Sequence, residues 1–194
     1  DRYAVPENDV EFQLCGYIDL VNAGLAHNKV AFLVLEKCDM TLSDYLHKTT
    51  SNPISFAIFK SILFQIIYTL YVINKIYPKF RHYDLHTENI MLKFDNNYKF
   101  KTTKPKFNIY TINGVNYSIP FFGIIPKIID FGFSSLPEES IISNATEDRI
   151  QMYYRSQNDI LILFHHIYGD LSRSGGDKFG KIDKLLQQLE PNRT

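Results

Sequence analysis

The chain has 194 residues, enough for one domain with a sizeable hydrophobic core. Its 21 basic and 21 acidic residues balance, so no overall electrostatic field directs it to nucleic acid or to a membrane surface, and we expect neither as a partner. Cys15 and Cys38 are too few for a disulfide framework, which leads us to expect a reducing cytoplasmic or nuclear location.

Three elements are predicted before residue 50. Apolar residues recur at steps of three and four through residues 7–25, and this spacing predicts a helix. Residues 29–36, KVAFLVLE, form an apolar run typical of a buried strand. Thr41 is followed three positions later by Asp44, so a short helix capped by Thr41 is expected to begin there.

The longest predicted helix covers residues 53–77, where apolar residues repeat near the helical period. Asn52 can cap its start, and Pro78 is expected to end it. A membrane span needs about 20 nearly uncharged residues. Lys60 and Lys75 leave only 14 residues between them, so we expect a buried helix of a globular domain.

Two short motifs carry the chemistry. Residues 82–92 read HYDLHTENIML, in which Asn89 follows Asp84 by five positions. Residues 128–132 read IIDFG, in which Asp130 follows an apolar strand. Phosphoryl transfer from ATP needs such groups: one carboxylate to orient the attacking hydroxyl, and a carboxamide with a second carboxylate to hold the magnesium ions that bridge the phosphates.

A long insertion lies between the two motifs, because 41 positions separate Asn89 from Asp130. It holds a lysine-rich segment, residues 93–106, and two alternating apolar runs on either side of Asn113-Gly114. An Asn-Gly pair between such runs predicts a β-hairpin. The lysine-rich segment is expected to be solvated, with binding to an acidic partner as the alternative.

Together the motifs resemble the protein kinase family. The hairpin, and His86 after the first motif's Asp-Leu, look like the haspin group and the kinases of large DNA viruses. The resemblance covers about residues 7–194 and implies an α+β fold. Residues 37–194 would form a mostly helical C-terminal lobe, with the basic segment and hairpin inserted at about 93–127. Residues 1–36 would be a remnant of the N-terminal lobe, a helix and a strand.

The resemblance implies a role for each motif residue, with ATP and Mg²⁺ as cofactors and a protein as substrate. Asp84 would accept the proton of the substrate hydroxyl, or orient that hydroxyl. His86 would hydrogen-bond the γ-phosphate. Asn89 and Asp130 would chelate magnesium, an ion that prefers hard oxygen ligands.

The resemblance also implies an adenine site. The segment LVLEKCDM looks like the hinge of kinases, with Leu35 as the gatekeeper residue. Backbone groups of Glu36 and Cys38 would then bind adenine, and Met91 would lie beneath it.

Two further residues would support the catalytic loop. Residues 156–169, SQNDILILFHHIYG, predict another buried helix, and a buried Asp159 on it needs hydrogen-bond donors. By the resemblance, Asp159 would accept backbone N–H groups of the catalytic loop, and His82 would pack against Phe131.

We therefore expect a serine/threonine protein kinase, with alternatives left open. One is a pseudokinase that acts as a scaffold. Another is a small-molecule phosphotransferase of the aminoglycoside or choline kinase type, which also uses Asp-Leu-His followed by Asn, although the Phe131-Gly132 pair favours protein substrates. A third is a zinc site formed by His82, Asp84 and His86.

The parts of a kinase that cover the phosphates are missing from this sequence. No glycine-rich loop precedes residue 7, and no Val-Ala-x-Lys strand is present. We therefore expect the chain to be a fragment that phosphorylates weakly or not at all by itself. Glu7 and Glu11 are equal candidates for the glutamate that would pair with the missing lysine.

Overall fold

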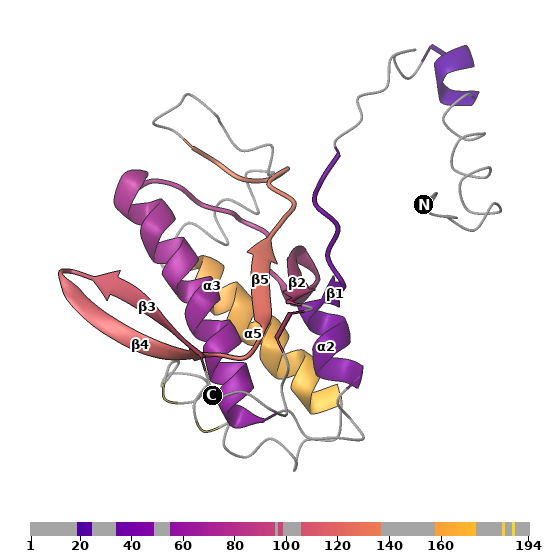
Figure 1. Cartoon of the computed structure of the whole chain (residues 1–194). Coiled ribbons are helices and arrows are strands. Elements are labelled where there is room, and N and C mark those ends of the chain that lie inside the picture. The colour runs from indigo at the N-terminus through magenta and orange to yellow at the C-terminus, as the bar shows by residue number, and fades with distance from the viewer. Residues whose placement is uncertain are drawn as a thin grey trace. The chain divides into compact units, whose positions relative to one another are not determined.

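The computed structural model describes residues 19–24, 34–48, 55–95, 97–98, 106–136 and 158–173, together with residues 184 and 188. The chain divides into two compact units, Asp1–Glu36 and Lys37–Thr194. Within the larger unit, helices pack beside a small antiparallel sheet and a separate hairpin, so its fold class is α+β (Figure 1).

The end of a helix is described in the smaller unit. Residues 19–22 are helical, and Gly24 follows with a φ of +71°, a conformation that glycine adopts without strain. The N–H of Gly24 donates to the carbonyl of Val21 at 3.0 Å. The earlier part of the helix predicted for residues 7–25 lies outside the described residues.

The strand predicted for residues 29–36 is wrong where it can be compared with the structure. Residues 34–36 adopt no regular structure, and Val34 and Leu35 are 92 % and 62 % exposed. Residues 29–33 lie outside the described residues. An apolar run carries no information about which neighbouring strand would pair with it, and a strand needs that partner.

The larger unit begins with a strand that passes directly into a capped helix. These are β1 (Met40–Thr41) and α2 (Leu42–Lys48). The hydroxyl of Thr41 accepts the N–H of Asp44 at 2.9 Å, and the carboxylate of Asp44 accepts the N–H of Thr41 at 3.4 Å. This reciprocal pair of bonds is a capping box, and it confirms the predicted start of the helix.

The long helix α3 (Phe56–Ile76) starts slightly later than expected. Its N-cap position is Ser55, whose side chain makes no capping hydrogen bond, and the predicted cap Asn52 lies outside the described residues. Serine and asparagine are about equally good caps, and the sequence alone could not choose between them. The predicted end is confirmed, because the helix stops two residues before Pro78.

By length and composition α3 could cross a membrane, yet one of its faces forms the centre of the larger unit's core. Five apolar side chains on it are at most 4 % exposed: Phe59, Ile62, Leu63, Ile66 and Leu70. Burying each contributes about 1.5–3 kcal/mol. This packing is that of a core helix in a globular domain, as the sequence predicts.

A three-stranded antiparallel sheet connects the two chemical motifs. Its strand order is β1, then β2 (Ile90–Phe94), then β5 (Ile124–Ile128). The register pairs Ile90 with Ile128, so the start of β2 and the end of β5 meet at one end of the sheet. The motif before β2 and the motif after β5 are thereby brought together.

The predicted hairpin is confirmed. Strands β3 (Lys106–Ile112) and β4 (Val115–Phe121) pair antiparallel through a two-residue turn at Asn113 and Gly114. These two residues have φ of +50° and +81°, the left-handed conformation that a type I′ turn requires. Of the lysine-rich segment, residue 96 and residues 99–105 lie outside the described residues.

The hairpin packs against α3 through aromatic rings. The ring centroid of Tyr110 lies 5.1 Å from that of Phe64 and 4.8 Å from that of Tyr68, both in edge-on geometry. The hydroxyl of Ser61 donates to the carbonyl of Pro120 at 2.7 Å. The insertion is therefore fixed to the core helix (Figure 1).

The last described element is helix α5 (Asn158–Arg173). It confirms the buried helix predicted over residues 156–169, from Asn158 onward. Leu163, Phe164 and Ile167 are each at most 2 % exposed and join the core. The same helix presents polar side chains to the catalytic loop.

Candidate active site

The loop that contains Asp84 is held by a carboxylate from α5. Asp159 is 7 % exposed, and its Oδ2 and Oδ1 atoms accept the backbone N–H groups of His82 at 2.9 Å and Tyr83 at 3.0 Å. Tyr83 has a φ of +64°, which is uncommon for an aromatic residue. The prediction that Asp159 accepts backbone N–H groups of the loop around Asp84 is confirmed.

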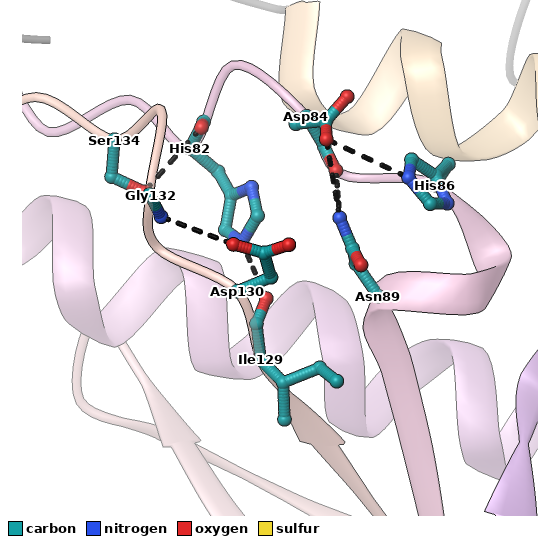
Figure 2. A network of polar contacts seen from close by, with 8 residues as sticks. All are labelled: His82, Asp84, His86, Asn89, Ile129, Asp130, Gly132 and Ser134. Carbon is teal, nitrogen blue, oxygen red and sulfur yellow. Dashed lines mark hydrogen bonds and ion pairs between the residues drawn. The ribbon is translucent and has the colours of Figure 1, made fainter. Parts of the chain in front are cut away.

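His82 joins the loop to the second motif. Its Nε2 atom lies 3.0 Å from the carbonyl oxygen of Ile129, and its ring centroid lies 5.1 Å from that of Phe131 (Figure 2). The predicted packing on Phe131 is thus confirmed. Burial lowers the pKa of His82, against an opposing effect of the Ile129 carbonyl and nearby carboxylates. Since a carbonyl only accepts, the neutral ring carries its proton on Nε2.

Asp84, His86 and Asn89 converge within this loop. The Nδ2 atom of Asn89 donates to the backbone carbonyl of Asp84 at 2.9 Å and lies 3.4 Å from its Oδ2 atom. The Nε2 atom of His86 lies 3.6 Å from the same Oδ2 atom (Figure 2). The side chain of Asp84 is 25 % exposed, so its carboxylate, although it has these contacts, is still accessible to solvent.

Beyond the pairing of β2 with β5, a further backbone hydrogen bond joins the second motif to the first. The N–H of Ile129 donates to the carbonyl of Asn89 at 3.0 Å, and Asp130 is the next residue. Asp130 has a φ of +58°, its Oδ1 atom accepts the N–H of Gly132 at 3.2 Å, and its side chain is exposed. Asp130 and Asn89 therefore lie at the same end of the sheet (Figure 2).

The donor set fits a magnesium ion. The amide nitrogen of Asn89 is directed to Asp84, and no hydrogen bond among the described residues uses its Oδ1 atom or the Oδ2 atom of Asp130. A carboxamide oxygen and a carboxylate oxygen are hard ligands, which Mg²⁺ prefers, usually together with phosphate oxygens and water. These two residues could hold the ion that a bound nucleotide brings.

The zinc interpretation of the first motif is wrong. Within the part of the chain that the structure describes, no three His, Cys, Asp or Glu side chains converge as metal ligands. His82 is directed to the carbonyl of Ile129, while His86 faces the carboxylate of Asp84. Alternation of ligand types along the sequence implied a shared strand face, but this segment is an irregular loop.

The residues predicted to contact adenine belong to different units. Met91 and Cys38 are half-buried residues of the larger unit, and Met91 lies in β2. Glu36 is exposed and belongs to the smaller unit. Their roles stay predictions. Glu7 and Glu11 lie outside the described residues.

Sequence reasoning missed two partners on α5. The hydroxyl of Thr87 donates to Oδ2 of the buried Asp170 at 2.6 Å. The ring centroid of His166 lies 5.4 Å from that of His86, and partial desolvation, followed by the electrostatic effect of His86, lowers the pKa of His166. A signal existed for Asp170, because it follows Asp159 by about three helical turns and shares its face.

No protein-family model matches the chain. Two proteins of Acanthamoeba polyphaga mimivirus, each named as a serine/threonine-protein kinase, do match. One is 32 % identical over 160 residues, which cover 77 % of this chain and 38 % of that protein. The other is 30 % identical over 208 residues, which cover 90 % of this chain and 43 % of that protein. The serine/threonine-protein kinase haspin of Bos taurus is 35 % identical over 105 residues, which cover 54 % of this chain and 12 % of that protein. The chain thus spans less than half the length of these relatives.

Proposed function

Because the chain is a relative of proteins named as serine/threonine-protein kinases, we propose that it transfers the γ-phosphoryl group of ATP to serine or threonine hydroxyls of a protein substrate. One observation carries this proposal. Asp84, Asn89 and Asp130 come from two motifs far apart in the sequence, and the sheet register brings both motifs to one end. Phosphoryl transfer needs such a set of oxygen atoms.

Each residue has a defined task in this proposal. Bound Mg²⁺ and ATP supply the phosphoryl group and the neutralisation of its charge. Asp84 accepts the hydrogen bond and then the proton of the attacking hydroxyl, whose oxygen forms the new bond to phosphorus as the bond to ADP breaks. Asn89 keeps the Asp84 carboxylate in place through Nδ2 and, with Asp130, offers oxygen atoms to the metal. His86 donates a hydrogen bond to the transferred phosphate.

The proposal also assigns the two units. The larger unit, Lys37–Thr194, is the C-terminal lobe, and the smaller unit is part of the N-terminal lobe. Glu36 and Cys38 supply backbone groups to adenine, and Met91 lies beneath the ring. The relatives are named as protein kinases, and this favours a protein substrate over a small molecule.

The test measures Asp84-dependent transfer in the longest natural form of the protein. Radiolabelled ATP is supplied with Mg²⁺ and with histones, casein or myelin basic protein as acceptors, and phosphoamino acids are identified afterwards. Asp84→Asn is expected to lower transfer to serine and threonine by about 100-fold or more. Asp95→Asn, at the other end of β2, is the matched control and should leave the rate unchanged. Nucleotide binding without any transfer would instead support the scaffold alternative.

A further inference from the structure

Helix α5 presents two buried carboxylates to the catalytic loop from one face. Asp159 and Asp170 are 11 positions apart, which is about three helical turns, and they are 7 % and 5 % exposed. Asp159 holds the start of the loop, and Asp170 holds its end through Thr87. Figure 2 shows α5, in pale yellow, beside the stretch that carries Asp84 and His86.

The contact between Thr87 and Asp170 is short and almost fully buried. The two oxygen atoms are 2.6 Å apart, within the range of about 2.5–2.7 Å for a hydroxyl that donates to a charged acceptor. Thr87 is 2 % exposed. The other carboxylate oxygen of Asp170 lies 3.7 Å from His47 Nε2 and 4.0 Å from an Arg173 guanidinium nitrogen. Water cannot easily replace the Thr87 hydroxyl at such a site.

The contact acts on the site through one turn of 3₁₀ helix, Thr87–Asn89. Thr87 is its first residue and Asn89 its last. The N–H of Asn89 donates to the carbonyl of His86, and the carbonyl of Asn89 accepts the N–H of Ile129, both at 3.0 Å. The turn is thus held at Thr87 and at Ile129, and from it the Asn89 amide donates to the carbonyl of Asp84 at 2.9 Å.

We propose that Asp170 is a positioning residue for the phosphoryl-transfer site. Through the Thr87 hydroxyl it holds the turn that carries Asn89, whose amide nitrogen donates to Asp84 and whose amide oxygen is the candidate magnesium ligand. The kinetic consequence rests on the proposed function, whereas the effect on the turn does not. If the bond only attached α5 to the rest of the larger unit, its loss would weaken all of the loop equally.

Amide hydrogen exchange separates a local effect from a general one. In Thr87→Val, which replaces the hydroxyl with a methyl group of similar size, the amides of Asn89 and Ile129 are expected to exchange about tenfold faster or more. The amide of Tyr83, which Asp159 holds, should change less than about twofold. Thr87→Ser keeps the hydroxyl and should restore wild-type exchange. Thr111→Val is the matched control, because it removes a hydroxyl bonded to a side chain on the hairpin.

Kinetics on the longest natural form give a second readout. Thr87→Val is expected to lower kcat about tenfold or more while the affinity for nucleotide without Mg²⁺ stays within about twofold, and Thr87→Ser should keep kcat. Asp170→Asn, whose neutral amide accepts a weaker bond, should show the same pattern to a smaller extent, and it carries the test if Thr87→Val does not fold.

Two exchange results would overturn the inference: unchanged exchange at Asn89 and Ile129 in a folded Thr87→Val, or equal acceleration at Tyr83. A wild-type protein without any transfer activity would overturn the proposed function instead, and the exchange measurement would still decide the role of Asp170.

Discussion

Tyr83 donates its backbone N–H to the Oδ1 atom of Asp159 at 3.0 Å while its own φ is +64°. A non-glycine residue in this conformation costs about 1–3 kcal/mol and persists only where the surroundings impose it. The conformation of the loop that carries Asp84 therefore depends on a carboxylate 76 positions further along the chain than Tyr83.

Replacing this carboxylate should destabilise the larger unit. Asp159→Ala leaves the buried N–H groups of His82 and Tyr83 without acceptors, and each such group costs about 1–3 kcal/mol. The free energy of unfolding, measured with urea, is expected to fall by about 2–6 kcal/mol. Glu88→Ala, an exposed acidic residue of the same loop, should change it by less than about 0.5 kcal/mol. Equal effects of the two variants would contradict the role given to Asp159.

Asn89 and Asp130 should be required for magnesium to strengthen nucleotide binding. Asn89→Ala and Asp130→Asn each remove an oxygen ligand or its charge, so the gain in ATP affinity on adding Mg²⁺ is expected to drop about tenfold or more. Isothermal titration with and without Mg²⁺ measures this gain. Asn108→Ala, on the exposed hairpin, is the control. An unchanged magnesium effect in both variants would remove these residues from the metal site.

Burial of His82 predicts a pH-dependent stability. Burial lowers its pKa in the folded chain, so below the ordinary histidine pKa of about 6.5 the unfolded state binds a proton that the folded state does not. Stability is complete above that pH and declines as the pH falls, by at most about 1.4 kcal/mol per pH unit for one histidine. His166, whose pKa is also lowered, adds to this slope.

Urea unfolding between pH 5 and pH 8 tests this expectation. His82→Gln should make the acid-side slope shallower. A wild-type slope retained in His82→Gln would mean that His82 does not stay neutral in the folded chain.

Two glycines should respond to alanine with opposite signs. Gly114 has a φ of +81° in the hairpin turn, so Gly114→Ala is expected to cost about 1–2 kcal/mol. Gly169 lies inside α5 with no atom within 4 Å of an added Cβ, so Gly169→Ala should stabilise the chain by about 0.5–1 kcal/mol. Chemical denaturation of both variants gives the two changes, and destabilisation by Gly169→Ala would contradict the helical assignment there.

Local signals predicted much of this structure. The Asn113-Gly114 turn and the capping pair of Thr41 and Asp44 depend only on residues within a few positions, so spacing alone identified them. Asp159 was predicted to hold the loop because a polar residue amid apolar helix neighbours needs buried donors, and the kinase resemblance indicated where those donors lie.

Contacts between distant parts of the chain that have no local or family signal could not be predicted from the sequence. The strand predicted up to residue 36 is wrong over residues 34–36, because no local pattern states which backbone will pair with an apolar run. The contact between Thr87 and Asp170 joins residues 83 positions apart. Helical spacing places Asp170 on the same face as Asp159, but nothing in the sequence indicates that Thr87, a threonine in a loop, is its partner.

The insertion between the two motifs leaves the sheet and returns to it at neighbouring residues of β2 and β5. Phe94 pairs with Ile124, and the N–H of Asp95 donates to the carbonyl of Gly123 at 2.8 Å. Doubling the length of a flexible loop costs only about 0.6 kcal/mol of closure entropy. A shorter connector between Phe94 and Ile124 is therefore expected to keep the register of β2 with β5, while it removes the contacts that the hairpin makes with α3.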